Sequence, residues 1–436
     1  MSSEWSLQKI SALGSFDRGK SKHRPRDAAH LYGGPYPFIQ TGDVTNANGR
    51  ITSYRQTYSE AGFTQSRLWP AGTLAITIAA NIAETALLTF PACFPDSVVG
   101  FIADPHKSDV RFVEYLFQAR RKQVKGQAYG SAQENINLEV LRKLEFPIPS
   151  LGVQVEIADF LSLLDDRIAL LRETNATLEA IAQALFKSWF VDFDPVSASM
   201  EGRAPEGMDE ATAALFPDGF EESELGLVPR GWRASTMGEV STVGIGKTPP
   251  RKEPQWFSES AYDTRWVSIR DMGASGVFAS QTSEYLTEES IQRFNVRVVP
   301  DNTTLLSFKM TIGRVAITDG EMTTNEAIAH FKLDAESPLT SEFIYLHLKQ
   351  FNYSSLSSTS SIADAVNSKT VRNIPVLVPD AEVLHAFQDQ IKPIFSRLKV
   401  IEQQAQTLAT LRDTLLPRLI SGQLRLPETT TLLEAV

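Results

Sequence analysis

"LSLLDDRIALLRETNATLEAIAQALFKSW" occupies residues 161–189, and "IKPIFSRLKVIEQQAQTLATLRDTLLPRL" occupies residues 391–419, 230 positions later. In both stretches mainly apolar side chains recur at alternating steps of three and four residues. The first set is Leu161, Leu164, Ile168, Leu171, Asn175, Leu178, Ala182, Leu185 and Trp189, and the second is Ile391, Ile394, Leu398, Ile401, Ala405, Leu408, Arg412, Leu415 and Leu419. A sustained pattern of this kind forms a narrow seam for another helix.

We therefore expect two long helices that pair with each other as an antiparallel coiled coil, which relates the two halves by pseudo-two-fold symmetry. Asn175 within the seam is expected to fix the register of the pair. The nine seam positions of each helix correspond to roughly 40 Å of helix. The alternative is that each helix packs only on its own domain.

The repeat extends into the segments before the helices. "GSAQENINLEVLRKLEFPIPS" at Gly130–Ser150 matches "SSIADAVNSKTVRNIPVLVPD" at Ser360–Asp380, again at an offset of 230. Further upstream, "PAGTLAIT" at Pro70 matches "PDNTTLLS" at Pro300, and "FIQTGD" matches "WVSIRD" at an offset of 228. Each matched exit segment predicts a capped helical turn followed by a strand.

Short β-rich runs such as "TLAITI" and "RVAITDG" alternate with turn residues and with helical stretches such as "TSEFIYLHLKQ". We expect an α/β (α+β) fold with two repeated globular domains, each followed by a long helix. The predicted organisation is a first domain at 1–153, a spacer helix at 154–194, an acidic linker at 195–229, a second domain at 230–379, a second spacer helix at 380–425 and a tail at 426–436.

The composition indicates a folded protein, with 42% hydrophobic and 22% charged residues. A single cysteine, no visible secretory signal and no apolar stretch free of polar residues favour a cytoplasmic protein outside the membrane. The formal charge of −10 is concentrated: residues 201–230 carry eight acidic and two basic side chains. Basic residues cluster elsewhere, for example at 18–26 and 120–125, where they could meet phosphates or simply face solvent.

No catalytic pattern emerges. "GIGKTPP" at Gly244–Pro250 lacks the first glycine of a phosphate-binding loop, because Ser241 stands there, and its prolines disfavour the helix that such a loop needs. The six histidines lack helical metal-ligand spacing, and Asp192 and Asp194 lie where a helix is expected to end at Pro195. We expect no metal site and no cofactor, and a non-catalytic chain.

The motifs together resemble the specificity subunit of Type I restriction–modification systems over nearly the whole chain. In the second half the resemblance rests on "GKTPPRKEPQWF", "WVSIRDM", "TIGRVAI", "TTNEAIAHFKL" and "LRDTLLPRLISGQLRL". In the first half it rests on "FIQTGDV", "ACFPDSVVGF" and the exit segment running into the helix. The sequence departs from the family pattern at Lys247, where many relatives have glycine, and at Glu326, where many have glutamine. The carboxylate of Glu326 cannot donate to a base edge or phosphate, but it can accept a hydrogen bond from a cytosine amino group.

The resemblance implies that each globule is a target recognition domain that reads one half of a bipartite double-stranded DNA site. It also implies that the helices separate the half-sites and bind two methylation subunits. The helix length of roughly 40 Å is close to the roughly 34 Å between sites one DNA turn apart. Those partners would carry S-adenosylmethionine, and motor–nuclease restriction subunits would bring ATP and magnesium. The alternatives are a stand-alone DNA- or protein-binding scaffold and a fused enzyme with unfamiliar active-site residues.

Base edges are read by side chains with hydrogen-bond donors and acceptors, which loops commonly carry. Polar residues in or near the matched loops are therefore the candidate DNA contacts. They are Thr41, Asn81, Gln127, Tyr129, Ser131 and Gln133 in the first domain, and Lys247, Thr248, Arg270, Lys309, Thr311 and Arg314 in the second. The base sequence that is read does not follow from these residues, because DNA shape contributes to it.

Overall fold

The computed structural model describes residues 5–23, 25–79, 81–128, 136, 138–356 and 366–426, with the side chains of residues 127 and 128 excepted. The chain forms two compact units. Unit 1 contains residues 1–169 and 406–436, and unit 2 contains residues 170–405. Two helices of 40 residues, α6 (Leu151–Phe190) and α15 (Ala381–Ile420), each contribute one end to unit 1 and the other end to unit 2.

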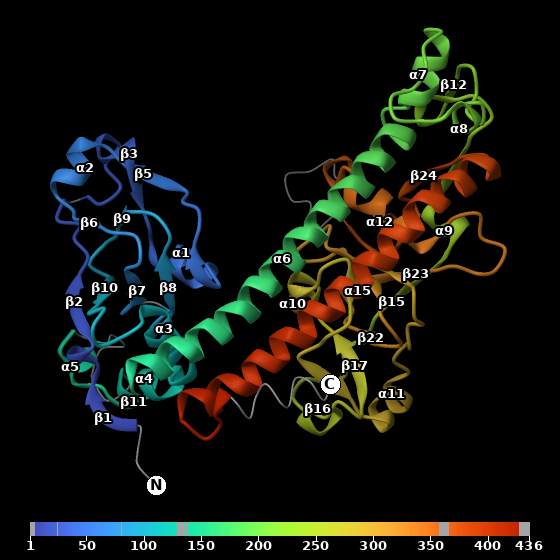
Figure 1. Cartoon of the computed structure of the whole chain (residues 1–436). Helices are drawn as coiled ribbons and strands as arrows, with labels where there is room; N and C mark the ends of the chain where they lie inside the picture. Colours follow the sequence, from blue (N-terminus) through green and yellow to red (C-terminus); the bar gives the residue numbers. More distant parts are fainter. Residues whose placement is uncertain are drawn as a thin grey trace. The chain divides into compact units, whose positions relative to one another are not determined.

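Unit 1 is built on two mixed sheets (Figure 1). The five-stranded sheet has the order β2 (Gly14–Arg18), β10 (Val98–Ala103), β7 (Leu74–Thr77), β8 (Thr85–Leu88) and β4 (Gly49–Ile51). The four-stranded sheet has the order β5 (Gln56–Tyr58), β3 (Tyr32–Phe38), β9 (Ala92–Cys93) and β6 (Leu68–Trp69). The helices are α1 (Thr41–Asn46), α2 (Glu60–Thr64), α3 (Val110–Ala119), α4 (Arg121–Ala128) and α5 (Leu138–Lys143), with 3-10 turns at Ile10–Ala12 and Ala29–Leu31.

Unit 2 repeats the strand order of the five-stranded sheet, and its four-stranded sheet differs from that of unit 1 at the edges. Its five-stranded sheet has the order β15 (Thr242–Ile245), β23 (Ile328–Lys332), β20 (Thr304–Ser307), β21 (Val315–Thr318) and β18 (Phe278–Ala279). The second sheet has the order β16 (Phe257–Ser258), β19 (Glu284–Leu286), β17 (Thr264–Val267) and β22 (Thr323–Thr324). The helices are α9 (Met237–Val240), α10 (Ile269–Ala274), α11 (Glu288–Phe294), α12 (Ser341–Gln350) and α14 (Ser368–Arg372), with 3-10 turns at Pro254–Trp256 and Tyr353–Leu356.

The register of the strands confirms the repeat that the sequence predicts. Phe38 pairs with Cys93 in a parallel bridge between β3 and β9, and Trp266 pairs with Thr323 in the parallel bridge between β17 and β22. The helix after each of these strands begins with a capping box, from Gln40 in α1 and from Ser268 in α10. The second half therefore rebuilds the fold of the first with different side chains.

The exit segments form the turn and strand predicted for them. In unit 1, β11 (Glu145–Pro149) pairs with β1 (Trp5–Lys9), and in unit 2, β24 (Pro375–Val378) pairs with β14 (Arg233–Thr236). Asn367 caps α14, since its side chain accepts hydrogen bonds from the backbone N–H groups of Lys369 and Thr370. Its twin Asn137 lies outside the described residues.

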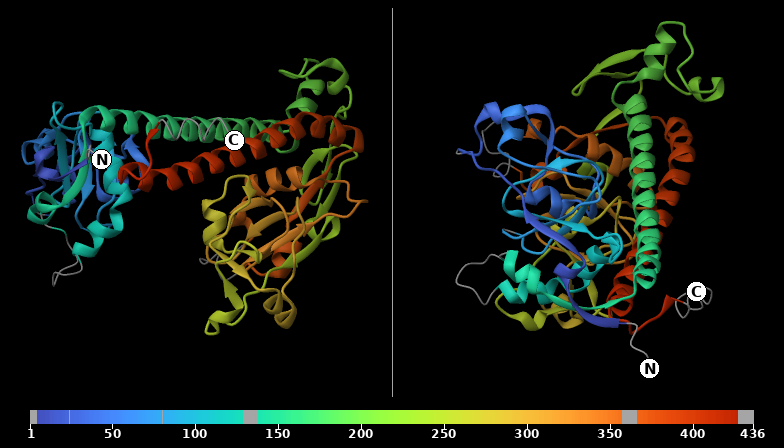
Figure 2. Two further views of the ribbon diagram at one scale, coloured as in Figure 1. Left: turned by 60° about the horizontal axis from the view of Figure 1, so that its bottom comes forward. Right: turned by 60° about the vertical axis from the view of Figure 1, so that its left-hand side comes forward.

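The two long helices lie side by side and antiparallel (Figure 2). In unit 2, Asn175 donates from Nδ2 to the carbonyl oxygen of Leu398 at 3.3 Å, and the rings of Phe190 and Phe387 pack with centroids 4.7 Å apart. Residue numbers thus rise along α6 as they fall along α15. The core of unit 1 includes Leu161 and Leu415, so both helices also enter that core. The predicted helix pair is confirmed, with Asn175 at the contact as expected.

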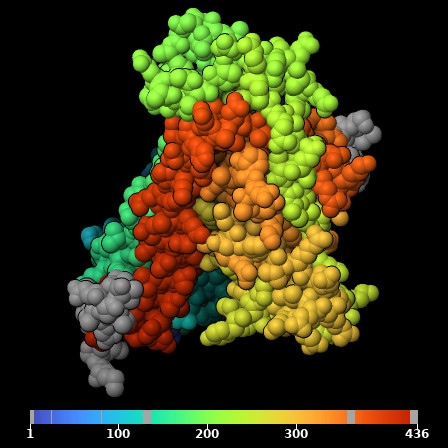
Figure 3. All heavy atoms as spheres, turned by 90° about the vertical axis from the view of Figure 1, so that its right-hand side faces the viewer, coloured from blue at the N-terminus to red at the C-terminus, as the bar shows by residue number. Residues whose placement is uncertain are grey.

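The acidic segment predicted as a linker is folded. It contains α7 (Asp194–Met200), α8 (Glu210–Ala213) and the hairpin β12 (Phe220–Ser223)–β13 (Gly226–Pro229). Figure 3 shows it beside the first turns of α15. The ring of Phe216 lies 5.1 Å from that of Trp189, so apolar residues between the acidic ones join the core of unit 2. Pro195 lies in the first turn of α7 and is not the residue that ends α6, because α6 ends at Phe190 and Phe193 adopts a left-handed conformation.

Candidate nucleic-acid interface

Four loops of unit 2 meet at one end of its sheets. Lys247 donates its backbone N–H to the Thr324 carbonyl at 2.9 Å, and Asn325 donates to Val267 at 3.1 Å. Phe308 donates to Ala327 at 2.9 Å. Together with the bond from Arg314 Nη1 to the Ile269 carbonyl, these bonds join residues 246–248, 268–271, 308–314 and 324–327, which we call the unit 2 loop cluster.

Close packing around Gly246 explains the second glycine of "GIGK", so no phosphate-binding role is needed to account for it. A Cβ on Gly246 would lie 2.2 Å from the Asn325 carbonyl oxygen and 2.2 Å from Thr324 Oγ1, so only glycine fits at this close approach. Unit 1 has the same arrangement at Gly19, where a Cβ would lie 2.3 Å from the carbonyl oxygens of Phe94 and Pro95. The glycines serve the packing of loops against each other.

The residue after each glycine is an exposed lysine. Lys20 donates its backbone N–H to Phe94 at 3.0 Å, as Lys247 does to Thr324. The contacts predicted from the sequence include Lys247 but not Lys20. The Gly-Lys pairs at 19–20 and 246–247 are visible in the sequence, but they are 227 residues apart, which hides them from a search at an offset of 230 or 228.

The structure brings the six predicted contacts of the second domain together in the unit 2 loop cluster. Lys247, Arg270, Lys309 and Thr311 are exposed there. Arg314 is less available, because its Nη1 donates to the Ile269 carbonyl at 2.5 Å and its guanidinium covers Gly273.

Thr248 is also engaged, as its hydroxyl donates to the carboxylate of Glu326. This bond gives Glu326 a partner inside the cluster.

The 308–314 turn between β20 and β21 is held by the hydroxyl of Ser307. Ser307 Oγ donates to the Thr311 carbonyl at 2.6 Å and accepts from the Arg314 backbone N–H at 3.0 Å. In unit 1, Thr77 at the matching position donates to the Asn81 carbonyl and accepts from the Glu84 N–H at 3.0 Å. The two units thus present different side chains on the same hydroxyl-braced turn, a feature that our sequence predictions did not include.

In unit 1 the structure brings Asn81 near Thr41. Asn81 Nδ2 donates to Thr45 Oγ1 at 3.2 Å, and Thr45 Oγ1 donates to the Thr41 carbonyl at 2.9 Å. The backbone of Gln127 lies in α4, but its side chain is not described. Tyr129, Ser131 and Gln133 lie outside the described residues.

Several basic side chains near these loops are already paired. Glu84 accepts from Arg121 at 3.0 Å and from Lys125 at 3.3 Å. Arg26 pairs with Asp96 at 2.7 Å. These cations hold unit 1 together, and their net field at a phosphate is reduced by their partners.

The predicted seam residues lie along the helix pair. Leu161, Leu164, Ile168, Leu171, Ile391, Leu398, Ile401 and Leu415 are buried, and Asn175, Leu178, Leu185, Ile394 and Leu408 are half-buried. The polar seam position Arg412 is explained by Asp165, whose Oδ1 lies 2.6 Å from Arg412 Nη1. Asp165 also accepts from the hydroxyl of Tyr115 in α3 at 2.6 Å, so this ion pair joins both helices to unit 1.

A carboxylate of α15 attaches the helix to the globule of unit 2. Glu402 accepts from the backbone N–H groups of Val277 at 2.8 Å and Phe278 at 3.1 Å. Burial raises the pKa of Glu402 to about 7, although these two hydrogen bonds favour its charged form. Sequence periodicity did not identify this residue, because it lies beside the seam.

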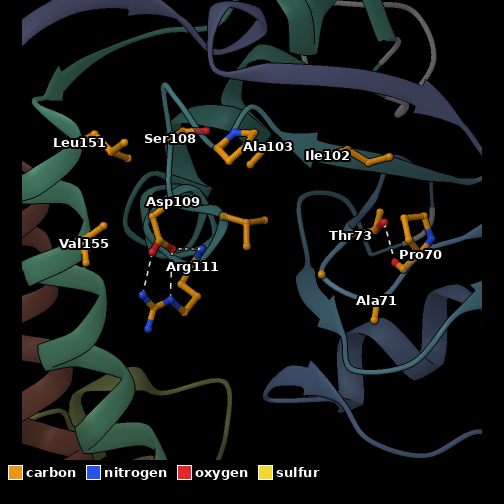
Figure 4. A pocket seen from close by; sticks show the side chains of 13 residues that line it. Pro70, Ala71, Thr73, Ile102, Ala103, Ser108, Asp109, Arg111, Leu151 and Val155 are labelled. Atoms are coloured by element: carbon orange, nitrogen blue, oxygen red, sulfur yellow. Dashed lines mark hydrogen bonds and ion pairs between the residues drawn. The ribbon is translucent and has the colours of Figure 1, made fainter.

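A cavity of about 440 Å³ in unit 1 is lined by Asp109, Arg111 and residues of the first turns of α6 (Figure 4). Asp109 caps α3, and its carboxylate lies 2.7 Å from the guanidinium of Arg111. The two charges in the cavity wall are therefore paired with each other. In the described part of the chain, no group of three or more potential ligands is placed to hold a metal ion. None of the helices described here is long and apolar enough to span a membrane.

Comparison with known proteins places these features in context. Residues 2–180 and 229–412 match the family model of the Type I restriction modification DNA specificity domain. The chain is 30% identical to the HindI specificity subunit of Haemophilus influenzae over 331 residues, covering 66% of this chain and 71% of that protein. It is 24% identical to the MjaIX specificity subunit of Methanocaldococcus jannaschii, covering 98% and 94%. The crystal structure of the S subunit from M. genitalium shares the fold, with a TM-score of 0.53 at 17% identity, covering 95% of this chain and 96% of that one.

Proposed function

Since this chain belongs to the Type I restriction–modification DNA specificity family, we propose that each of its two units reads one half of a bipartite double-stranded DNA site. The observation that supports this proposal is that the two units share the same loop backbone but carry different side chains on it. The Gly-Lys loop and the hydroxyl-braced turn occur in both units, whereas Asn81 is replaced by Thr311 and Glu84 by Arg314. A common frame with different donors and acceptors is what two different base sequences require.

The two exposed lysines provide sequence-independent affinity in this proposal. Lys20 and Lys247 stand at the same place in each frame and bind phosphate, which positions each unit on the duplex. Thr311 in unit 2 and Asn81 in unit 1 then face base edges. The overall charge of −10 does not oppose this arrangement, because much of it lies in the segment 195–229, away from the loops in sequence.

Matched single substitutions test whether each unit reads its own half of the DNA site. The chain is assembled with the methylation subunits of its own system, and the enriched sequence is determined by selection from a random duplex pool. Thr311→Ala is expected to relax selection in one half of the motif by about tenfold, and Asn81→Ala in the other half. A motif without two separated halves, or a variant that relaxes both halves, would contradict the proposal. Assembly-independent binding by the chain alone would favour the stand-alone scaffold.

We further propose that the outer faces of the helices dock two methylation subunits, while the paired seams set the spacing of the half-sites. Leu163, Leu170 and Ile181 are 68%, 52% and 45% exposed. Spacings of 7 and 11 residues bring all three to one face of α6, away from the seam. An exposed apolar stripe on a soluble surface marks an interaction site, and a partner helix would cover it.

In this proposal the chain itself is non-catalytic. The methylation subunits bind S-adenosylmethionine and modify adenine, and motor–nuclease subunits that bind ATP and magnesium join them for restriction.

Leu170→Glu tests the docking surface. It puts a charge into the stripe without entering the buried seam, so folding is expected to persist and co-purification with the methylation subunit to fail. Ala176→Glu places the same charge on another exposed face of α6 and serves as the control. Equal co-purification of both variants would contradict docking on this face. Substitution of Leu164 or Leu171 is less informative, because both are buried and their loss destabilises the helix pair itself.

A further inference from the structure

Met310 is an apolar side chain displayed at the tip of the 308–314 turn. It is 86% exposed and has φ of 59°. The Thr311 backbone N–H bonds to the Lys309 carbonyl at 2.7 Å, which places Met310 at the centre of a three-residue turn. Glycine or asparagine adopts this conformation at lower cost than methionine. The backbone conformation of the turn therefore does not explain why residue 310 is a methionine.

The turn holds Met310 in a fixed position. Phe308 before it is 1% exposed, and Ile312 after it packs against the core of unit 2. Ser307 braces the turn at both Thr311 and Arg314, as described above. The methionine is thus held outside a rigid frame, which is a condition for a specific contact.

The polar and basic side chains around Met310 suit a contact with DNA. Lys309 and Thr311 are exposed on either side of it, and Lys247 and Arg270 are exposed in the same loop cluster. The tip closes an antiparallel pair of strands, β20 and β21, and the major groove accepts a two-stranded β-ribbon. The apolar group that base pairs present in the major groove is the C5-methyl of thymine.

We propose that Met310 contacts the C5-methyl group of a thymine in the half-site read by unit 2. This inference rests on the proposed function, because it requires unit 2 to bind DNA with its loop cluster. The residue aligned with Met310 in unit 1 is Ala80, which lies outside the described residues and is too short for an equivalent reach. The thymine contact is accordingly expected in one half-site.

Met310→Gly separates this contact from a structural role. Glycine relieves the positive φ, so the melting temperature is expected to stay the same or to rise. Affinity of the assembled complex for its selected duplex is expected to fall by about fivefold to tenfold, with no change on scrambled duplex. Replacing one thymine of the unit 2 half-site by uracil, which lacks the methyl, is expected to cost the wild-type complex about fourfold and the variant nothing. Met310→Leu keeps an apolar side chain and is expected to retain most of the affinity.

Other results would overturn the inference. Equal affinity of the wild-type and Met310→Gly complexes would remove Met310 from the interface. A wild-type complex insensitive to uracil, with a rise in 2-aminopurine fluorescence that depends on Met310, would indicate a wedge between bases instead of a methyl contact. A wild-type complex that binds selected and scrambled duplexes equally would overturn the proposed function and this inference with it, whereas the first result leaves the proposed function intact.

Discussion

Replacing Ser307 by alanine removes the hydroxyl that braces the 308–314 turn. The Ser307 side chain donates to the Thr311 carbonyl at 2.6 Å and accepts from the Arg314 N–H at 3.0 Å. Each lost hydrogen bond costs about 1 kcal/mol, and an N–H left without a partner adds to this, so we expect a destabilisation of about 2 kcal/mol. For a unit of this size this corresponds to a decrease of roughly 4–8 °C in the melting temperature of unit 2.

Calorimetry measures the transition of unit 2, and hydrogen exchange of peptides from the turn locates the change. Ser307→Thr is the matched control, because Thr77 braces the equivalent turn of unit 1 with the same pair of contacts. We expect Ser307→Thr to retain the stability and slow exchange of the wild type. In the DNA selection experiment, only Ser307→Ala should relax the half-site read by unit 2. A neutral Ser307→Ala, or a Ser307→Thr that is equally destabilised, would refute the bracing role.

Three further predictions concern the helix pair. Burial raises the pKa of Glu402 from 4.5 to about 7, so wild-type stability should decline as the pH rises through this interval. The Glu402→Gln variant should lack this decline. Its unfolding free energy relative to that of the wild type should therefore rise by at most about 3 kcal/mol between pH 4.5 and 8. A difference between the two proteins that does not change with pH would contradict this. Leu398→Ala should cost about 2–5 kcal/mol in urea unfolding because Leu398 is fully buried, whereas Val400→Ala, at an exposed position, should cost less than about 1 kcal/mol. Asp165→Asn and Arg412→Ala should show a coupling energy of about 1 kcal/mol in a double-mutant cycle, and additive effects would argue against the ion pair.

The elements with regular local patterns were predicted well. Seam residues three and four positions apart identify α6 and α15, because a helix places such residues on one face whatever the rest of the chain does. The expected capping turn at Asn367 also depends only on neighbouring residues. The boundaries were less accurate: α6 begins at Leu151 and ends at Phe190, compared with the predicted 154–194.

The acidic segment shows why composition alone misled. Its eight acidic side chains suggested a linker, but Val196, Phe216 and Val228 are spaced far enough apart in sequence to escape a periodicity search. All three are nonetheless buried, and Val196 and Phe216 join the core of unit 2 together with Trp189 of α6 and Phe387 of α15. Burial of these few apolar groups is enough to fold the segment, because the surface of the core already exists.

By itself the sequence determined that two related globules are each followed by a long helix and that the helices carry matching seams. The tertiary structure decided which of the polar loop groups remain available. Arg314 donates to a carbonyl 45 residues away, Thr248 to a carboxylate 78 residues away, and Glu402 accepts from an N–H 125 residues away. Periodicity and capping arise from neighbours along the chain, whereas these partners become neighbours only when strands and helices pack, and a hydrogen bond forms only within about 3.5 Å.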